Sequence, residues 1–496
     1  MTYQSTRGSD HPVTGAGAVA AGIAPDGGLY IPEEFPYVTE EQIEQMADMD
    51  YIGRAETVLS LFFPEFSKEE MHALCEAAYG GDRFDHPAVA PVVRLDENTH
   101  VLELFHGPTC AFKDMALQML PGLLTQSLRK NGEERKVCIL VATSGDTGKA
   151  ALEGFRDRKG CEIIVFYPRD GVSAVQKLQM TTQEGGNVRV FAVEGNFDDA
   201  QTGVKTAFAD EGLRQRLAEK GILLSSANSI NWGRLAPQIV YYFSAYCDLL
   251  TQGAIHLGDT VNFCVPTGNF GDILAGFIAG MMGLPVGKFI CASNENNVLT
   301  DFIRTGRYDR KRPFHTTRSP SMDILISSNV ERLIYLLSDC NASLTRSRME
   351  ALKKDGEYTL TETEKAVLGE YFYGGFADDK ATLATIGETF RDKQYAADPH
   401  TAVALSVLKN YRRETDDRTE TVVLSTASPF KFCDSVLTAL DGEMHENGTE
   451  LLAQLSAAVD VPVPGPLAGL GERKVRFTEQ IPADAICRTV EDALTK

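Results

Sequence analysis

Lys113 stands in the stretch HGPTCAFKDMA (106–116), where a Gly-Pro turn precedes what reads as the start of a helix. An ammonium group is costly to bury without a partner. Lys113 is therefore either a solvated residue on a first helical turn or a residue kept for its amine chemistry. Solvated first-turn lysines are common, so this stretch alone favours the first interpretation and leaves the second open.

The best candidate for a phosphate site is the loop PTGNFGD (266–272), which follows the apolar run TVNFCV and precedes the apolar helix ILAGFIAGMMG. Gly268 and Gly271 let the backbone fold closely around a phosphate at the N-terminus of that helix. Thr267 and Asn269 can add hydrogen bonds. We therefore expect this loop to cradle a phosphate group.

Two further loops carry hydroxyl groups. TSGDTGK (143–149) offers backbone N–H groups to an anion at a helix start, but it is not a P-loop, because Thr143 replaces the first glycine and Ala150 follows the lysine. It can equally be a capped strand-to-helix turn with Asp146 or Thr147 as the cap. In STASPFK (425–431), the hydroxyl groups can hold a ring nitrogen and Lys431 can meet an anion. Alone, this third loop is more often an ordinary turn.

The three loops and the lysine together are more informative than any one of them. An amine, a phosphate cradle and a polar partner for a ring nitrogen are what pyridoxal 5′-phosphate requires of a protein. A metal enzyme has no support, because the sequence has no HExxH, no paired CxxC and no clustered histidines.

The elements that must position these loops read as a parallel α/β fold. Apolar, β-branched runs alternate with helical patterns, which predicts parallel strands with ligand sites beyond their carboxyl ends. Residues 1–95 lack a strong strand series and are predicted to form a separate N-terminal region, and residues 300–400 a helical insertion. The predicted strands are VCILVAT (137–143), CEIIVFY (161–167), NVRVFAV (187–193), TVNFCV (260–265), KFICA (288–292) and TVVLST (421–426).

Composition excludes several classes of protein. The 496 residues are 43% hydrophobic, enough for two or three domains, and carry a net charge of -21. Such a surface repels nucleic acid and anionic membranes, so any anionic substrate needs locally concentrated cations. The ten scattered cysteines read as reduced thiols. The N-terminus lacks the apolar core of a signal peptide and no long apolar run is present, so we expect a cytoplasmic protein.

Motifs spread over nearly the whole chain resemble the threonine synthase family in its longer bacterial and fungal form. The resemblance implies a fold-type II pyridoxal-phosphate enzyme, with two open α/β lobes and the cofactor between them. It also implies the last step of threonine biosynthesis, a lyase reaction that converts O-phospho-L-homoserine and water into L-threonine and phosphate. The motifs are YQSTRG, DGGLYIPEEFP, HGPTCAFKD, TSGDTG, YPRDGVSAVQ, NSINWGR, PTGNFGD, SPSMDILISSNVERL, DPHTAVA and STASPFKF.

The resemblance also assigns roles to residues. Lys113 would bind the cofactor covalently and then act as general base, and Phe112 would wall the ring. The cofactor phosphate would lie on Thr267, Gly268, Asn269, Phe270 and Gly271, and Thr426 would face the pyridine nitrogen. Ser144, Asp146 and Thr147 would lie near the substrate carboxylate and the cofactor's 3′ oxygen.

The chain departs from the family pattern where Ser428 replaces a frequent histidine and Phe430 replaces a smaller residue, so no role of that histidine carries over. For the substrate phosphate the stronger candidates are Lys149 and Arg234, and the weaker ones Arg332 and Lys431. Each of these cations has an alternative structural role.

The resemblance divides the chain into an N-terminal region (1–95), a large domain (96–130 and 235–496) and a small mobile domain (131–234), in a monomer or homodimer. Two other functions stay open. A phospho-lyase would release 2-oxobutyrate, ammonia and phosphate, and a silent pyridoxal-phosphate-binding protein would release no phosphate at all.

Overall fold

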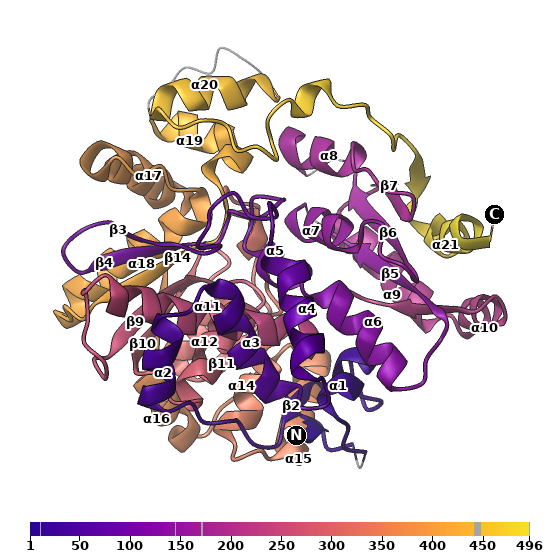
Figure 1. Ribbon diagram of the computed structural model, residues 1–496, viewed down its shortest axis with the longest axis horizontal. Helices are drawn as coiled ribbons and strands as arrows, with labels where there is room; N and C mark the ends of the chain where they lie inside the picture. The colour runs from indigo at the N-terminus through magenta and orange to yellow at the C-terminus, as the bar shows by residue number, and fades with distance from the viewer. Residues whose placement is uncertain (10, 144, 170–171, 441–447, 496) are drawn as a thin grey trace.

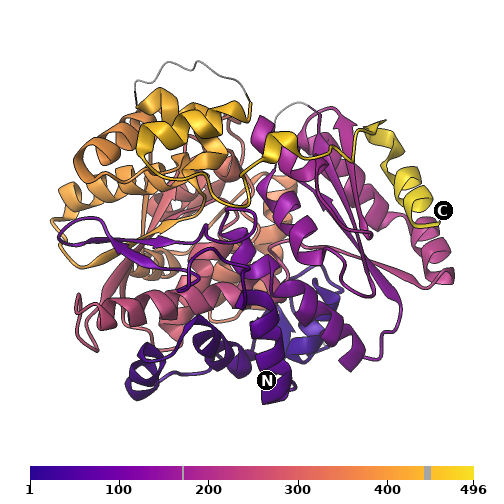
Figure 2. The same ribbon diagram turned by 45° about the horizontal axis from the view of Figure 1, so that its top comes forward.

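Two open α/β sheets, each covered by helices, form two domains that lie side by side in the computed structural model (Figures 1 and 2). The structure describes residues 1–9, 11–143, 145–169, 172–440 and 448–495. All six apolar runs predicted as strands are strands, with ends that differ from the prediction by no more than two residues. The predicted α/β class is therefore confirmed.

The large sheet has the strand order β13-β10-β9-β14-β4-β3, in which β3 alone runs antiparallel to its neighbour. Since β9, β14 and β4 are adjacent and parallel, the loops that follow them leave the same edge of the sheet. Its strands are β3 (Val92–Arg94), β4 (Thr99–Glu103), β9 (Val261–Pro266), β10 (Val286–Ser293), β13 (Phe372–Phe376) and β14 (Thr421–Ser425).

The small sheet has the order β15-β7-β6-β5-β8 and is entirely parallel. Its strands are β5 (Lys136–Ala142), β6 (Cys161–Pro168), β7 (Val188–Glu194), β8 (Ile222–Ser225) and β15 (Gln480–Pro482). Its helices are α7 (Asp146–Phe155), α8 (Ala174–Thr181), α9 (Phe197–Ala209) and α10 (Glu211–Glu219).

The chain's last residues lie on the small sheet, which corrects the assignment of 235–496 to the large domain. Strand β15 pairs with β7, and α21 (Ile486–Thr495) packs on α9 and α10, as the yellow segment beside β7 shows in Figure 1. The physical reason is apolar burial: Ile486 and Val490 share a core with Val204 and Ala207 of α9.

The N-terminal residues share the large domain's core. Helices α1 and α3 pack on α6 and α11, and their buried side chains belong to the same apolar cluster as the large sheet. The predicted boundary at residue 95 falls within the turn between β3 and β4, which pair as a hairpin. The elements are β1 (Tyr3–Ser5), α1 (Gly15–Ala21), β2 (Tyr30–Pro32), α2 (Glu40–Ala47), α3 (Tyr51–Phe62), α4 (Lys68–Tyr79), α5 (Lys113–Leu117), α6 (Leu120–Lys130) and α11 (Trp232–Thr251).

Residues 300–400 are mainly helical, as predicted, but β13 within them returns to the large sheet beside β10. Two short strands, β11 (Arg307–Asp309) and β12 (Glu357–Thr359), form an antiparallel ribbon. The helices from here to the C-terminal region are α12 (Gly271–Met281), α13 (Val298–Thr305), η1 (Pro320–Met322), α14 (Val330–Leu337), α15 (Ala342–Lys354), α16 (Glu362–Tyr371), α17 (Asp379–Lys393), α18 (Pro399–Thr415), η2 (Pro429–Phe432), α19 (Cys433–Ala439), α20 (Glu450–Val459), η3 (Leu470–Glu472) and η4 (Ala483–Ala485).

Local sequence signals explain where several helices begin. Helices α2, α4, α8, α9 and α16 each start at a capping box, in which the cap side chain and the third helical residue exchange hydrogen bonds with each other's backbone N–H groups. Helix α7 is different, because its cap is Gly145 and no side chain at that position accepts a hydrogen bond. Thr143 instead accepts hydrogen bonds from the N–H groups of Gly145 and Gly148.

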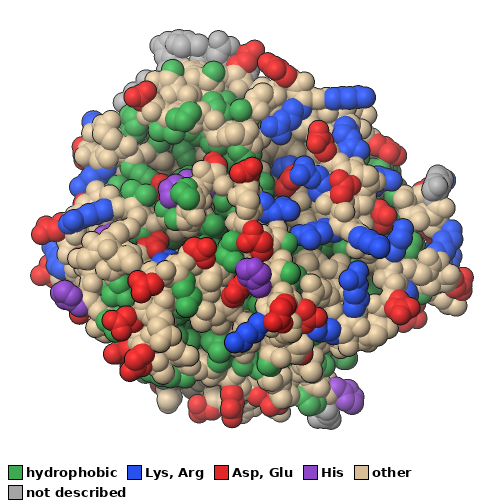
Figure 3. Space-filling view, in the orientation of Figure 1, with side chains coloured by type: hydrophobic (Ala, Val, Ile, Leu, Met, Phe, Trp, Pro, Cys, Tyr) green, Lys and Arg blue, Asp and Glu red, His purple; other side chains and the backbone are tan. Residues whose placement is uncertain are grey.

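Charge is unevenly spread over the surface. On the face in Figure 3, Lys and Arg side chains gather over the small domain, whereas Asp and Glu prevail over the N-terminal helices at the lower edge. A surface hollow of about 470 Å³ lies beside α17 and α18, but none of the predicted site residues lines it. In the described ranges, no helix is long and apolar enough to cross a membrane.

Candidate active site

Lys113 is a buried amine without a polar partner. It begins α5, its side chain is only 9% exposed, and its Nζ lies 4.6 Å from the centre of the Phe112 ring. Among the described residues it forms neither a hydrogen bond nor a salt bridge. Burial lowers the pKa of Lys113 to about 8, with Asp146 and Asp272 opposing the change and Arg234 and Lys431 adding to it. The structure thus rules out the solvated first-turn interpretation.

The loop that carries Lys113 is fixed before the helix begins. Asp114 accepts hydrogen bonds from the backbone N–H and the hydroxyl of Thr109, at 2.8 and 2.9 Å. A Cβ atom on Gly107 would lie 2.5 Å from the Cβ of Asp114, so only glycine fits there. Cys110 takes the left-handed conformation with φ 59°. These contacts fix the conformation of the loop that carries the Lys113 amine.

The loop after β14 clamps the same segment. The N–H of Phe112 donates to the carbonyl of Thr426 at 2.8 Å, and the N–H of Ser428 donates to the carbonyl of Cys110 at 3.0 Å. Thr426 is 5% exposed. Since β14 is the neighbour of β4, Thr426 lies beside the Lys113 segment at the carboxyl edge of the large sheet.

The predicted phosphate cradle leads into the N-terminus of a helix. Helix α12 begins directly after Phe270, which takes the left-handed conformation with φ 62°, and the first N–H groups of a helix have no partner within it. A Cβ atom on Gly268 would lie 2.8 Å from the carbonyl oxygen of Ser321. Asn269 is exposed, and Thr267 is buried with its hydroxyl donating to Val265.

These residues fit pyridoxal phosphate on three counts. The amine of Lys113 is buried and unpaired, a helix N-terminus after a glycine-containing turn offers donors for a phosphate, and both lie at one sheet edge with Thr426 between them. Asp146 stands opposite on α7, from the small domain. Thr147 is half-buried beside it, and Ser144 lies outside the described residues.

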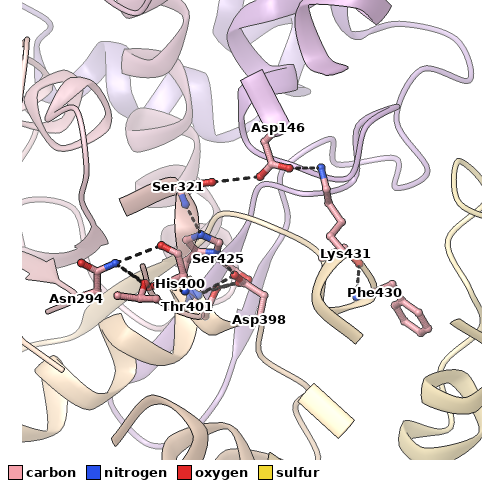
Figure 4. Close-up of polar contacts among 12 residues, drawn as sticks. Asp146, Asn294, Ser321, Asp398, His400, Thr401, Ser425, Phe430 and Lys431 are labelled. Carbon is pink, nitrogen blue, oxygen red and sulfur yellow. Dashed lines mark hydrogen bonds and ion pairs between the residues drawn. The ribbon is translucent and has the colours of Figure 1, made fainter. Parts of the chain in front are cut away.

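Asp146 is buried yet ionised. Its Oδ1 lies 2.6 Å from the Nζ of Lys431 and accepts a hydrogen bond from Gln176 at 2.9 Å, while its Oδ2 accepts one from Ser321 at 3.4 Å (Figure 4). Burial by itself would raise the pKa of Asp146, but Lys431 and Lys113 hold it well below its usual range. Lys431 is thereby a partner of Asp146 in this structure.

The four candidate cations differ in whether they already have partners. Arg234, on the first turn of α11, is 5% exposed, donates among the described residues only to the carbonyl of Ala227, and has a buried Nε with no partner there. No salt bridge joins it to a described acidic residue. Burial lowers its pKa to about 10, with Tyr241 opposing the change, so the side chain stays charged near pH 7. An uncompensated buried guanidinium is suited to an anionic ligand.

The other candidates are engaged. Lys149 forms a salt bridge with Glu153 at 3.1 Å and donates to Gln183. Arg332 is fully buried and donates to the carbonyls of Tyr30 and Ile230 and to the side chain of Asn329. Asn329 in turn contacts the cradle, donating to the carbonyl of Asn269. Arg332 therefore supports the cradle from behind.

Sequence reasoning missed two groups of residues near this site. Asp272, on the first turn of α12, accepts hydrogen bonds from Tyr241 and Tyr242, and its second oxygen is buried without a partner. His400 and Asp398 form a buried pair at 2.7 Å, and the N–H of Ser321 donates to the other ring nitrogen of His400 (Figure 4). The motifs PTGNFGD and DPHTAVA contained these residues, but nothing in their spacing assigned them a function.

The comparisons with known proteins agree with this geometry. Residues 86–427 match the family described as pyridoxal-phosphate dependent enzyme. The chain is therefore a pyridoxal-phosphate enzyme of fold type II, which confirms the predicted cofactor and fold. Residues 2–79 match the threonine synthase N terminus and residues 401–490 the threonine synthase C-terminal family.

Two relatives that match most of this chain indicate which family of pyridoxal-phosphate enzymes it resembles. The chain is 43% identical over 444 residues to threonine synthase of Pseudomonas aeruginosa, covering 89% of this chain and 91% of that one. It is 40% identical over 456 residues to human threonine synthase-like 1, covering 90% of this chain and 60% of that protein.

A solved structure points the same way. The crystal structure of pyridoxal-phosphate-bound threonine synthase from Brucella melitensis superposes with a TM-score of 0.88 at 39% identity, covering 100% of this chain and 98% of that one. The chain belongs to the threonine synthase family, and the predicted resemblance is confirmed.

Proposed function

We propose that this protein converts O-phospho-L-homoserine and water into L-threonine and phosphate, using pyridoxal phosphate. The observation that carries the proposal is that two buried basic side chains without an acidic partner occur in one site. One is the amine of Lys113, beside the phosphate cradle, and the other is the guanidinium of Arg234, whose charge acts on Lys113. The first suits the cofactor, and the second suits an anionic substrate.

Pyridoxal phosphate, when bound, supplies an electron sink for negative charge at the substrate's α carbon. Lys113 would bind it covalently, Phe112 would line the ring, and the segment from Thr267 to Gly271 would hold the phosphate, with Asn269, Gly268 and Phe270 shaping the turn. Thr426 would face the ring nitrogen with a neutral hydroxyl. Asp146 would lie toward the 3′ oxygen.

Lys113 is suited to carry protons to and from the α and β carbons in turn. Burial lowers its pKa to about 8, so both its protonated and neutral forms are populated near pH 7 to 8. It is held by its loop at a fixed point on the sheet edge, so the same amine can reach successive atoms without rearrangement of the fold. No other buried amine among the candidates is free of a polar partner, since Lys149 and Lys431 are both paired.

Arg234 would bind the substrate phosphate and stabilise it as it leaves. The planar guanidinium of Arg234 can donate two parallel hydrogen bonds to phosphate oxygens, and burial strengthens these bonds. Thr147, Ser144 and the N-terminus of α7 would receive the substrate carboxylate, since a helix N-terminus favours an anion. Lys149 would contribute through α7 only if its pair with Glu153 opens.

The test is a product assay with phosphohomoserine and the purified holoenzyme. We expect threonine and phosphate in equal amounts, and no product from Lys113→Ala. Predominant 2-oxobutyrate and ammonia would show a phospho-lyase, and bound cofactor without phosphate release would show a silent binding protein. The assay separates all three functions in one experiment.

We further propose that the protein works in the cytoplasm as a monomer or homodimer on this small substrate. All ten cysteines are free thiols in the structure, and most are buried, which supports a reducing compartment. The net charge of -21 disfavours nucleic acid and anionic membranes as partners. Size-exclusion chromatography with light scattering measures the assembly.

A further inference from the structure

A buried salt bridge joins the two domains beside Lys113. Lys431 belongs to η2 of the large domain and Asp146 to α7 of the small domain, and their charged atoms lie 2.6 Å apart. The Lys431 side chain is 0% exposed and that of Asp146 is 3% exposed. Burying two charges costs a large desolvation free energy, which only close pairing and further hydrogen bonds offset.

Each charged group of the pair makes such further hydrogen bonds. Gln176 and Ser321 donate to the carboxylate of Asp146, one from each domain. The amine of Lys431 donates to the carbonyl of Thr109 at 3.0 Å. Thr109 lies in the loop that carries Lys113, so Lys431 binds that loop and Asp146 at the same time.

Four charged groups from different elements act on the amine of Lys113. Asp146 on α7 and Asp272 on α12 favour its protonated form, whereas Arg234 on α11 and Lys431 on η2 disfavour it. Asp272 is hydrogen-bonded by two tyrosines, and Arg234 has no acidic partner among the described residues. Among these four charges, Asp146 has the largest effect on the pKa of Lys113, and it raises that pKa. An Asp146 without its partner would therefore keep the amine protonated.

We propose that Lys431 is a positioning residue that keeps Asp146 as half of a neutral pair, so that this carboxylate orients its neighbours without fixing a proton on Lys113. The inference rests on the proposed function only in requiring that Lys113 carry pyridoxal phosphate. Lys431 then sets the charge around the amine of Lys113 through its pair with Asp146, and it does not bind the substrate phosphate.

The test is a pH titration of the visible absorption of the holoenzyme, which reports the protonation of the linkage between Lys113 and the cofactor. Lys431→Met removes a cation and frees Asp146, so the midpoint should rise by about one pH unit or more. Asp146→Asn leaves the cation alone, so the midpoint should fall. In the double variant Asp146→Asn/Lys431→Met the midpoint should return close to that of the wild type.

Arg348→Met is the matched control, because it breaks another buried salt bridge, that of Arg348 with Glu364 on α15 and α16. It should lower the melting temperature without moving the midpoint. Identical midpoints in Lys431→Met and the wild type would overturn the proposal, as would a double variant that stays as shifted as Lys431→Met.

The design holds even if one variant does not fold. Should Lys431→Met not fold, the double variant must still titrate at least about one pH unit above Asp146→Asn, and equal midpoints overturn the proposal. The result is distinct from a failure of the proposed function. A holoenzyme that binds pyridoxal phosphate but makes no threonine still titrates, and a wild type without visible absorption contradicts the cofactor assignment instead.

Discussion

The large-domain and small-domain halves of the candidate site are held by different kinds of contact. Lys113, Thr426 and the cradle at 267–271 follow three neighbouring strands of one sheet, and backbone hydrogen bonds join the first two of these segments. Asp146 begins α7 of the small domain and meets the large domain through side chains, chiefly Lys431 and Ser321. Backbone register thus fixes one half, whereas side-chain pairing positions the other.

This difference predicts that substitutions in the two halves fail in different ways. A change in the large-domain half should remove a defined chemical group or displace the cofactor, while the rest of the site stays in place. A change in the small-domain half should alter the charges and the relative placement of the domains.

Lys113→Ala tests the centre of the large-domain half. We expect kcat to fall by about 10⁴-fold or more, because the other candidate lysines, Lys149 and Lys431, are both paired and cannot take its place. The visible absorption of the Lys113–cofactor linkage should disappear, while the cradle still retains some pyridoxal phosphate. Spectroscopy and the product assay measure both effects. Retained absorption would mean that another lysine binds the cofactor.

Arg234→Ala tests the uncompensated cation. We expect kcat/KM for phosphohomoserine to fall by about 2–4 kcal/mol in transition-state free energy, because the guanidinium should bind the phosphate most tightly as it leaves. The cofactor absorption should survive. Homoserine lacks the phosphate and should bind the variant and the wild type equally. If its affinity falls as far as that of the substrate, Arg234 supports the fold instead.

Gly268→Ala and Gly271→Ala compare two positions of the cradle. The added methyl group on Gly268 meets a backbone carbonyl at 2.8 Å, whereas on Gly271 it meets the side-chain nitrogen of Asn329 at 3.2 Å. A backbone atom yields less readily than a side chain. Gly268→Ala should therefore weaken pyridoxal-phosphate binding by about tenfold or more, and Gly271→Ala by less. Equilibrium titration of the apoenzyme measures both, and the reverse order would contradict the geometry.

His106→Gln tests the start of the loop that carries Lys113. His106 pairs with Asp85 at 2.5 Å and Glu103 at 2.9 Å. Burial would lower its pKa, but these carboxylates raise it to about 9. A raised folded-state pKa stabilises the protein fully below pH 6.5, and this stabilisation is lost as pH rises through about 9.

The variant should remove that dependence. We expect the free energy of unfolding of the wild type to fall by roughly 1–3 kcal/mol between pH 6.5 and 9 in excess of the variant. Denaturant melts at several pH values measure it. Parallel curves for the two proteins would show that the pair with Asp85 and Glu103 does not stabilise the loop.

The sequence alone predicts that the segments of the large-domain half meet at one edge of a sheet, and the structure places them there. Apolar runs identify buried strands, and the loops after parallel strands meet at one edge, so the sequence places Lys113, Thr426 and the cradle in one region. The pairing of Lys149 with Glu153 was also readable, because residues four apart on a helix are neighbours.

The remainder depends on contacts between distant residues. Arg332 donates to backbone carbonyls of Tyr30 and Ile230, about 300 and 100 residues away along the chain, and no local pattern encodes such bonds. The short strand β15 contains a proline and has too few residues to show a period. Whether Arg234, Arg332 and Lys431 are free or engaged therefore emerges only when these distant segments come together.

The return of the C-terminal segment to the small sheet affects how the protein is made. Strand β15 is the edge strand of the small sheet and pairs with β7, although nearly 300 residues separate the two strands along the chain. During synthesis, β7 is finished long before residues 480–495 leave the ribosome, so it presents an unpaired, apolar edge to other nascent chains. The small domain reaches its final form only after residues 480–495 have been made, and a chain that lacks them would leave the edge of β7 unpaired and be prone to aggregation.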